Sequence, residues 1–261
     1  MEDNAVPFEL PAESASLARQ ERRWQVLGVL TLLVAMVFGY RLVGLSVDPA
    51  RARSLATQLD LALPFWPDSI YAYSMVYVCA LYPLFAVRSS RLFSRTVEAY
   101  GWVMASSLVI FALFPVTSVG LRPDLALLDV TQFTQWGTRV TYFVDPPTNC
   151  FPSMHLSFAV LSMLVAWSAR PLWGLVAAPV VIGIAVSILT MKQHYLADGV
   201  AAVALAAAVW WRQVRPTGLA LRGRAEVARS WRGPALYLAL QMLFYALFWL
   251  AFQAGWQPWQ S

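Results

Sequence analysis

Long uncharged stretches recur along the chain, and short segments rich in arginine separate them. Seven of these stretches have about the 17 to 25 residues that a helix needs to cross the hydrocarbon core of a bilayer. They are residues 24–40, 69–87, 99–117, 152–169, 171–190, 196–211 and 234–255. Their apolar residues follow one another without the alternation of barrel strands, which indicates helices. We therefore expect an all-α integral membrane protein with about seven transmembrane helices.

The polar segments between these stretches indicate four parts of the chain. In chain order, we expect a disordered cytoplasmic tail (1–23), a six-helix functional core (24–212), an Arg-rich cytoplasmic loop (213–232) and an extra C-terminal transmembrane helix (233–261). The longest connection, 118–151, is a candidate cap over the functional site. The apolar spacing of residues 125–143 within it predicts a helix on the membrane surface.

The composition agrees with a membrane protein and excludes several other classes. Hydrophobic residues make up 59% of the chain and charged residues 13%, about half the charged fraction of a soluble domain. Cys79 and Cys150 are too few for a disulfide scaffold or a Cys-rich zinc site, and we expect two free thiols. The net charge of +5 comes from basic residues dispersed between apolar stretches, so nucleic acid is not an expected partner.

The basic residues also predict an orientation in the membrane. If the N-terminus is cytoplasmic, 13 of the 19 Lys and Arg residues lie on the cytoplasmic side and six on the other. This bias favours a cytoplasmic N-terminus and an external C-terminus. The Arg residues of the 213–232 loop are then expected to act as topology anchors. Compact loops and the lack of a recognisable targeting signal suit a bacterial inner membrane.

Ionisable residues gather at the predicted outer ends of the helices, where burying charge is costly and therefore indicates a functional site. His194 and Asp198 are four residues apart at a predicted helix start, so the carboxylate can accept an imidazole N–H and fix the tautomer. His155 follows Ser153 at a helix start initiated by Pro152. Free backbone N–H groups at such a start favour an anion.

These residue types match the needs of phosphoryl transfer, which requires cations around the phosphate oxygens, an in-line nucleophile and an acid for the leaving alkoxide. Arg122 and Lys192, the only lysine, can supply charge, while His194 can be the nucleophile and His155 the proton donor. A metal site of His155, His194 and Asp198 is the alternative, but without a second carboxylate a metal-dependent hydrolase is less favoured. We expect no metal and no cofactor.

Two segments carry a resemblance to a known family. Phe151-Pro-Ser-Met-His155 and His194-Tyr-Leu-Ala-Asp198 resemble the second and third motifs of the type 2 phosphatidic acid phosphatase superfamily, in order, in spacing and in their placement on the fourth and sixth helices. The resemblance covers residues 24–212 in architecture and 115–199 in motifs. The sequences of residues 145–155 and 192–195 are similar to those of the branch that includes inositol phosphorylceramide synthases and many bacterial members.

The resemblance implies a six-helix core and a role for each motif residue. His194 would attack phosphorus, Asp198 would orient His194, and His155 would be the general acid. Ser153 and Arg122 would hold the phosphate.

The sequence departs from the family pattern at two positions. Pro115 and Ile188 stand where the family usually has Lys and Arg, so two expected phosphate cations are missing. Lys192 is expected to replace one of them, and its alternative role is that of an interfacial anchor. Three further residues of the long connection are weaker candidates for headgroup contacts: Arg139, Asp145 and Asn149.

We therefore expect a metal-independent lipid phosphate phosphatase that forms a phosphohistidine at the outer membrane face, with water as the acceptor. Its substrate would be a phospholipid or polyprenyl phosphate from the surrounding bilayer, with no obligate protein partner. One alternative is a lipid phosphotransferase of the inositol phosphorylceramide synthase type. Another is a catalytically silent lipid-binding or transport protein on the same scaffold.

Overall fold

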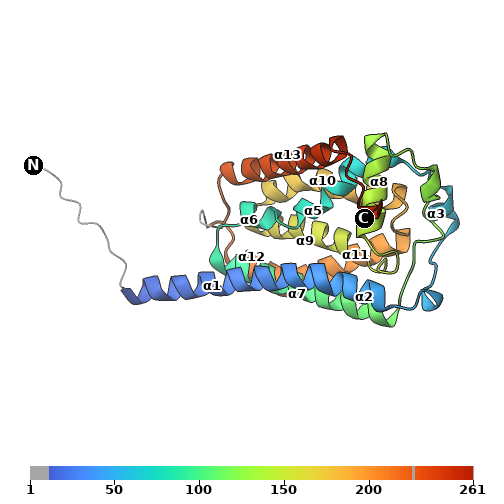
Figure 1. The fold of residues 1–261 in the computed structure, drawn as a ribbon. Helices are drawn as coiled ribbons and strands as arrows, with labels where there is room; N and C mark the ends of the chain where they lie inside the picture. The colour runs from blue at the N-terminus through green and yellow to red at the C-terminus, as the bar shows by residue number, and fades with distance from the viewer. Residues whose placement is uncertain (1–11, 225–226, 261) are drawn as a thin grey trace, which may run out of the picture.

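The structure is a computed structural model that describes residues 12–224 and 227–260. Every regular element in these residues is a helix, and no strand forms among them. The long helices lie side by side in one bundle, with α1 along one edge and α13 along another (Figure 1). The prediction of an all-α chain is confirmed.

Four helical segments are long and apolar enough to cross a bilayer. They are residues 23–46, α7 (Ser90–Leu113), α10 (Pro171–Thr190) and α13 (Arg232–Gln253). The shorter apolar helix α9 (Met154–Ala169) packs in the bundle against α10 and α11 (Leu196–Val209). Residues 23–46 and α13 bury little of their surface inside the protein, which suits helices that face lipid. The protein is an all-α membrane bundle.

The first helix is longer than predicted. α1 (Ala12–Val34) continues through a π-type turn, η1 (Ala35–Gly39), into α2 (Tyr40–Ser46). The expectation of a disordered tail is wrong for residues 12–23, because this segment is rich in the strong helix formers Ala, Leu, Glu, Gln and Arg. Residues 1–11 of the predicted tail lie outside the described residues.

The second predicted span is not one continuous helix. It consists of three short helices, α4 (Ile70–Ser74), α5 (Val76–Cys79) and α6 (Tyr82–Ala86). Pro83 explains the second break, because it lacks the N–H that would reach the carbonyl of Cys79. The Ser162 hydroxyl donates to that carbonyl over 2.7 Å instead, and the Tyr100 hydroxyl donates to the Ala80 carbonyl over 3.1 Å. Neighbouring helices thus satisfy backbone groups that the break leaves free.

The sixth predicted helix extends past its predicted end at residue 211. α11 runs through a second π-type turn, η5 (Trp210–Val214), into α12 (Arg215–Ala220). The wide turn leads the helix up to Pro216, which has no N–H for an α-helical hydrogen bond. The first part of the predicted Arg-rich loop is therefore helical. Residues 225–226 of that loop lie outside the described residues.

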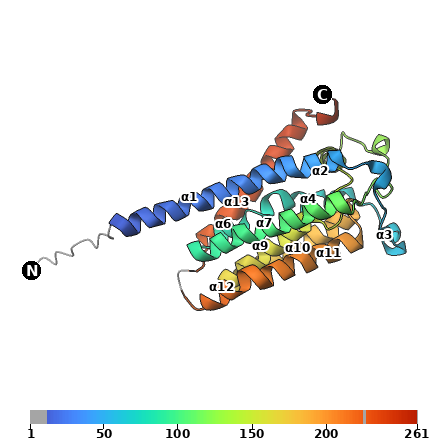
Figure 2. The ribbon, with the colours of Figure 1, turned by 90° about the horizontal axis from the view of Figure 1, so that it is seen from below.

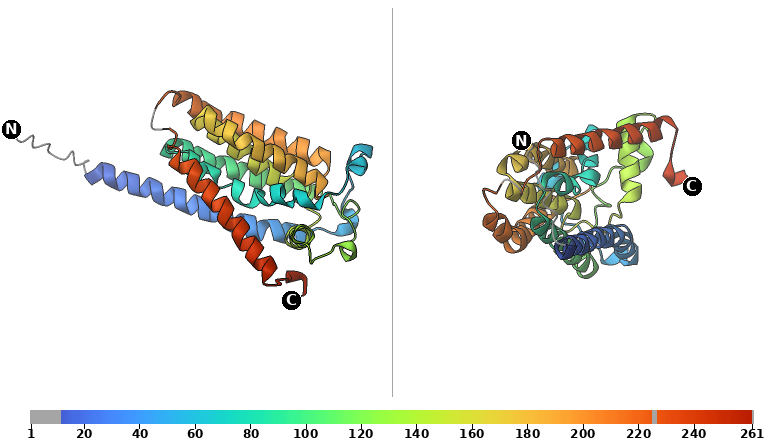
Figure 3. Two further views of the ribbon diagram at one scale, coloured as in Figure 1. Left: turned by 90° about the horizontal axis from the view of Figure 1, so that it is seen from above. Right: turned by 90° about the vertical axis from the view of Figure 1, so that its left-hand side faces the viewer.

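α8 (Phe133–Val144) is the regular helix within the long connection. It begins later than residue 125 because Asp124 and Asp129 hold the preceding chain in turns, each accepting from the backbone N–H two residues on. α8 lies across the bundle axis (Figure 1) and is seen end-on in the left view of Figure 3. The remaining short elements are η2 (Pro49–Arg51), α3 (Gln58–Ala62), η3 (Pro67–Ser69), η4 (Leu125–Leu127) and η6 (Pro258–Gln260).

The bundle has two ends. α3 and α8 lie at one end and α12 lies at the other (Figures 1 and 2), and we call these the α8 end and the α12 end. α7 and α10 finish at the α8 end, and α9 and α11 begin there. Because the candidate residues sit at these helix termini, the fold gathers them at the α8 end.

Candidate active site

Two backbone contacts at the α8 end bring the sequence motifs together. Val116, just after α7, pairs as an isolated bridge with Asn149, just before α9. The Ser153 N–H donates to the carbonyl of Asp198 over 3.2 Å. The first turns of α9 and α11 therefore lie next to each other, although more than 40 residues separate their starts.

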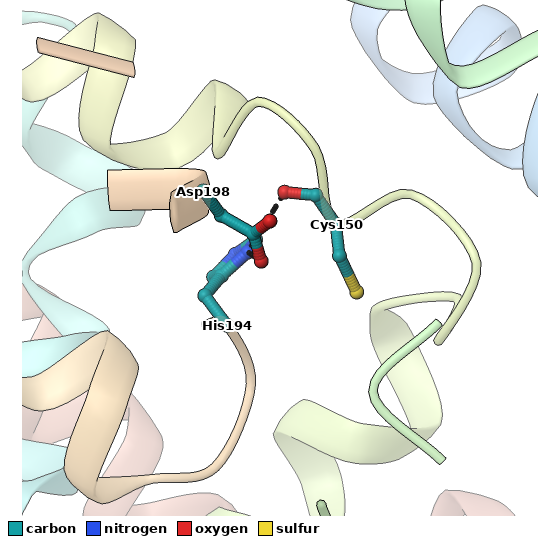
Figure 4. A group of neighbouring side chains, drawn as sticks. All are labelled: Cys150, His194 and Asp198. Atoms are coloured by element: carbon teal, nitrogen blue, oxygen red, sulfur yellow. Dashed lines mark hydrogen bonds and ion pairs between the residues drawn. The ribbon is translucent and has the colours of Figure 1, made fainter. Parts of the chain in front are cut away.

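His194 is held through both of its ring nitrogens. Nδ1 lies 3.0 Å from the Cys150 carbonyl oxygen and 3.3 Å from Asp198 Oδ2, and Figure 4 shows these groups together. Both neighbours of Nδ1 are acceptors, so Nδ1 carries the proton and Nε2 keeps its lone pair. The Ser153 hydroxyl, 3.1 Å from Nε2, donates to that lone pair. His194 is thus held in the tautomer that a nucleophile needs.

Asp198 is fully buried, and its carboxylate has a second hydrogen-bond partner besides His194. Its Oδ2 also accepts the Tyr195 N–H over 2.8 Å, which caps the start of α11. Its Oδ1 has no partner among the described residues. Because the Cys150 carbonyl shares Nδ1, the carboxylate is one of two groups that fix the tautomer of His194.

His155 has a carboxylate neighbour of its own. Its Nε2 lies 3.7 Å from Oδ1 of Asp145, whose Oδ2 accepts the hydroxyls of Tyr73 and Tyr77 over 3.0 and 3.2 Å. The ring centroids of His155 and His194 are 6.4 Å apart. The sequence placed Asp145 only among headgroup contacts, and the available signal was its presence as the one acid in residues 145–155. Each histidine therefore faces one carboxylate.

Arg122 reaches the same place from the middle of the connection between α7 and α8. Its Nε donates to the Ser118 hydroxyl over 3.1 Å, and its guanidinium donates to the Asp145 carbonyl and to the Gln193 side-chain oxygen. The guanidinium also lies 4.5 Å from the ring centre of Tyr142. These contacts fix a positive charge beside the two histidines. The sequence missed Gln193, although it is next to His194.

A small cavity joins these side chains. It is lined by Tyr40, Tyr73, Arg122, Asp145, Pro146, Asn149, Cys150, His155, Gln193 and His194. Asn149 Nδ2 donates to the Tyr40 carbonyl over 2.7 Å. Asn149 Oδ1 and Gln193 Nε2 are buried and have no partner among the described residues. A buried acceptor and a buried donor are thus left over in the side chains of this cavity, as expected where a polar ligand completes the hydrogen bonds.

Lys192 is not among the residues that line the cavity. Its Nζ donates to the backbone carbonyls of Asp60 and Leu63, over 2.7 and 2.6 Å. Burial lowers the pKa of Lys192, and the nearby Asp60 charge opposes this shift. Asp60 Oδ1 in turn accepts the N–H of Leu196, the first residue of α11, over 2.7 Å. Lys192 thus fastens α3 to the segment that carries His194.

The pKa of Asp60 is lowered although its carboxyl is buried. Burial raises its pKa, but hydrogen bonds from Thr57 and the Leu196 N–H, and then the charge of Lys192, outweigh burial and lower the pKa. Asp60 therefore stays ionised and can hold the start of α11.

Arg139, like Lys192, is a candidate that lies outside the cavity. Its guanidinium lies 4.6 Å from the ring centre of Trp259, and the residue does not line the cavity. Asn149, the other weaker candidate, does line it.

One group of side chains has the spacing of metal ligands, and it differs from the set expected from the sequence. Ligand atoms of Cys150, His194 and Asp198 lie within 4.8 Å of one another (Figure 4), whereas His155 is not part of the group. Burial raises the pKa of Cys150 to about 12, so its sulfur keeps the proton that a metal would have to displace. Both Cys79 and Cys150 are free thiols, as predicted. These donors fit a metal ion poorly.

The chain was compared with known families, curated proteins and solved structures. The family model described as the PAP2 superfamily matches residues 41–212, which include every motif residue discussed above. No curated protein and no solved structure matches the chain. Because the family match covers well over half of the sequence, the chain belongs to the PAP2 superfamily, whose members are generally phosphatases or phosphotransferases.

Proposed function

We propose that this protein removes the phosphoryl group of a lipid phosphate through a phosphohistidine on His194, with water as the final acceptor. The observation that carries this proposal is the shared cavity of His194, His155 and Arg122. A nucleophile in the required tautomer, a second imidazole and a fixed cation are the three groups that the transfer of a phosphoryl group needs.

In the first step, Nε2 of His194 attacks phosphorus and the bond to the lipid oxygen breaks. Ser153 passes its hydrogen bond from Nε2 to a phosphate oxygen, and Arg122 stabilises the charge on the other oxygens. His155 gives a proton to the leaving alkoxide. Burial of His155 disfavours the charged imidazolium, and the carboxylate of Asp145 beside it opposes this effect before the transfer.

In the second step, water attacks the phosphohistidine and His155 takes the proton from it. Phosphate leaves and His194 returns to the neutral form. The Cys150 carbonyl and Asp198 keep the proton on Nδ1 throughout. Asp198 also stabilises the positive charge that the imidazole carries while it is phosphorylated.

The proposed substrate is a phospholipid or polyprenyl phosphate that enters from the bilayer. α13 and residues 23–46 present mostly unburied apolar surface, which suits contact with lipid chains. The distribution of basic residues supports an external position for the α8 end and a cytoplasmic position for the α12 end. We propose this orientation in a bacterial inner membrane.

A lipid phosphotransferase is the second candidate, and one observation favours it. His155 and His194 are only 5% and 4% exposed, so bulk water has little access to the phosphohistidine. Exclusion of water protects a reactive intermediate from hydrolysis and favours transfer to a lipid hydroxyl.

Incubation of the purified protein with phosphatidate, phosphatidylglycerophosphate and polyprenyl diphosphate tests the proposal. Phosphate release that persists in EDTA supports the metal-independent phosphatase. Transfer of the group to an added lipid alcohol, without phosphate release, supports the phosphotransferase. Loss of activity in EDTA with recovery on adding a divalent ion contradicts the mechanism, and inactivity toward all three lipids and the alcohol supports a silent scaffold.

A further inference from the structure

A second polar cavity lies at the α12 end of the bundle, away from the candidate active site at the α8 end. It has a volume of about 800 Å³ and lies between the end of α9, the start of α10, the η5–α12 segment and the chain before α13. Six arginines line it: Arg88, Arg170, Arg215, Arg222, Arg224 and Arg229. No acidic side chain is among the described residues that line this arginine cavity.

The charges of these arginines are not neutralised within the described part of the chain. The one Arg–carboxylate pair found there is Arg95–Glu98, which lies outside the arginine cavity. Arg215 and Arg170 lie over tryptophan rings, at 3.8 and 5.0 Å, contacts that leave the charge in place. Converging cations in a concave surface create a strong local attraction for anions.

Three of the arginines have side chains without a partner in the part of the chain that the structure describes. Arg229 Nε donates to the Val87 carbonyl over 3.1 Å, so that side chain is partly occupied. The side chains of Arg88, Arg222 and Arg224 are exposed and have no hydrogen bond, ion pair or ring contact among the described residues. A guanidinium without a partner offers two parallel N–H donors to a phosphate.

The base of the arginine cavity is firmly packed and partly aromatic. Trp210 and Trp167 both line it, and the Trp210 indole N–H donates to the Ser168 hydroxyl over 2.8 Å. α12 lies so close to α9 that a Cβ at Gly218 would come within 2.8 Å of the Ser168 Cβ. The uncapped start of α10 at Pro171 adds its positive dipole end. Apolar rings next to cations suit a ligand that is itself part apolar and part anionic.

We propose that the arginine cavity is a second anion-binding site, which takes a phosphate group carried by an anionic phospholipid or by a free phosphorylated molecule. Topology anchors need positive charge near the membrane but have no need to converge on one hollow. This site is independent of the reaction proposed for His194. Its ligand is bound and not transformed.

Binding can be measured on the full-length protein in detergent by native mass spectrometry. Phosphatidylglycerol is the lipid probe, phosphatidylcholine is the zwitterionic control, and glycerol 3-phosphate is the free competitor. The site variant is Arg170→Gln/Arg222→Gln/Arg224→Gln. The matched control is Arg91→Gln/Arg212→Gln/Arg232→Gln, which removes equal charge from arginines of the same part of the bundle that do not line the arginine cavity.

We expect the site variant to bind phosphatidylglycerol at least tenfold more weakly and the control variant less than twofold more weakly. Displacement of the lipid by glycerol 3-phosphate identifies the phosphate as the recognised group, whereas binding of the lipid without displacement assigns the site to a membrane headgroup. Equal losses in both variants, or a loss caused instead by Arg122→Gln at the α8 end, would overturn the proposal. If the glutamine variant does not fold, Arg170→Lys/Arg222→Lys/Arg224→Lys keeps the charge and should lose only the bidentate contacts. If the lysine variant binds phosphatidylglycerol as the wild type does, the single variant Arg222→Glu is measured next. The proposal requires that this variant lose the lipid.

Discussion

The α8 and α12 ends use charged residues in opposite ways. At the α8 end, His155, His194 and Asp198 are buried, and each faces a partner fixed by the fold. At the α12 end, arginines are exposed, and Arg222 and Arg224 have no partner among the described residues. A buried charge is stable only when it is paired, whereas an exposed guanidinium stays hydrated until a ligand arrives.

This contrast between the two ends indicates where a reaction and where simple binding can be expected. Fixed partners hold the proposed nucleophile, acid and cation at the α8 end in one geometry before a substrate arrives, and such preorganisation lowers the barrier of a reaction. Exposed arginines without a fixed partner among the described residues can bind anions but do not hold a reacting atom in one position. Substitutions at the α8 end should therefore change turnover, and those at the α12 end should change ligand binding.

The largest expected effect is that of His194→Ala. Without the proposed nucleophile, phosphate release should fall by about 10⁴-fold or more, because the covalent intermediate can no longer form on His194. Initial rates with a lipid phosphate measure the effect, and the thermal unfolding midpoint shows that the variant is folded. The Arg170→Gln/Arg222→Gln/Arg224→Gln variant serves as the contrast. If that variant loses as much turnover as His194→Ala, the division between the two ends is wrong.

Asp198→Asn should have the next largest effect. Loss of a carboxylate that alone fixes a catalytic tautomer costs about 10⁴-fold in kcat. Here the Cys150 carbonyl also accepts from Nδ1, at 3.0 Å, so we expect a smaller loss, of about 10² to 10³-fold. Single-turnover rates report this loss directly. A variant as inactive as His194→Ala would show that the carbonyl does not hold the tautomer.

His155→Ala should distinguish substrates by their leaving groups. General acid catalysis contributes about 10²-fold or more when the leaving group is a poor alkoxide, and little when it is an activated phenolate. We expect a large decrease for a lipid phosphate and a several-fold decrease for an aryl phosphate. The wild-type rate on lipid should be bell-shaped in pH, because His194 reacts in its neutral form and His155 in its protonated form. Equal decreases for both substrates would make His155 a phosphate ligand.

Lys192→Ala should have the smallest effect on chemistry and act through stability. It leaves the buried carbonyls of Asp60 and Leu63 without their donor, which costs about 1–3 kcal/mol in the free energy of unfolding. Lys192→Arg should keep part of this stability. Denaturant unfolding and KM are measured together for both variants. A large loss of kcat with unchanged stability would return Lys192 to the role of a phosphate cation.

Local features of the sequence were enough to predict the helical class and the main catalytic candidates. Apolar stretches report burial in lipid residue by residue, since each side chain contributes independently to the transfer free energy. The four-residue spacing of His194 and Asp198 predicted their contact, which forms although His194 lies two residues before α11. These predictions needed no knowledge of the rest of the chain.

The contacts between distant segments depend on the three-dimensional arrangement of the helices. Pro83 breaks the second span, yet the hydroxyl that satisfies the freed carbonyl comes from Ser162 on another helix. Lys192 binds carbonyls more than 120 residues away, and the partner of His155 is a carboxylate held by tyrosines of α4 and α5. The arginine cavity likewise forms only when four segments meet at the α12 end. A hydrogen bond or charge pair depends on distances of a few ångströms, and hydropathy and spacing along the chain do not contain those distances.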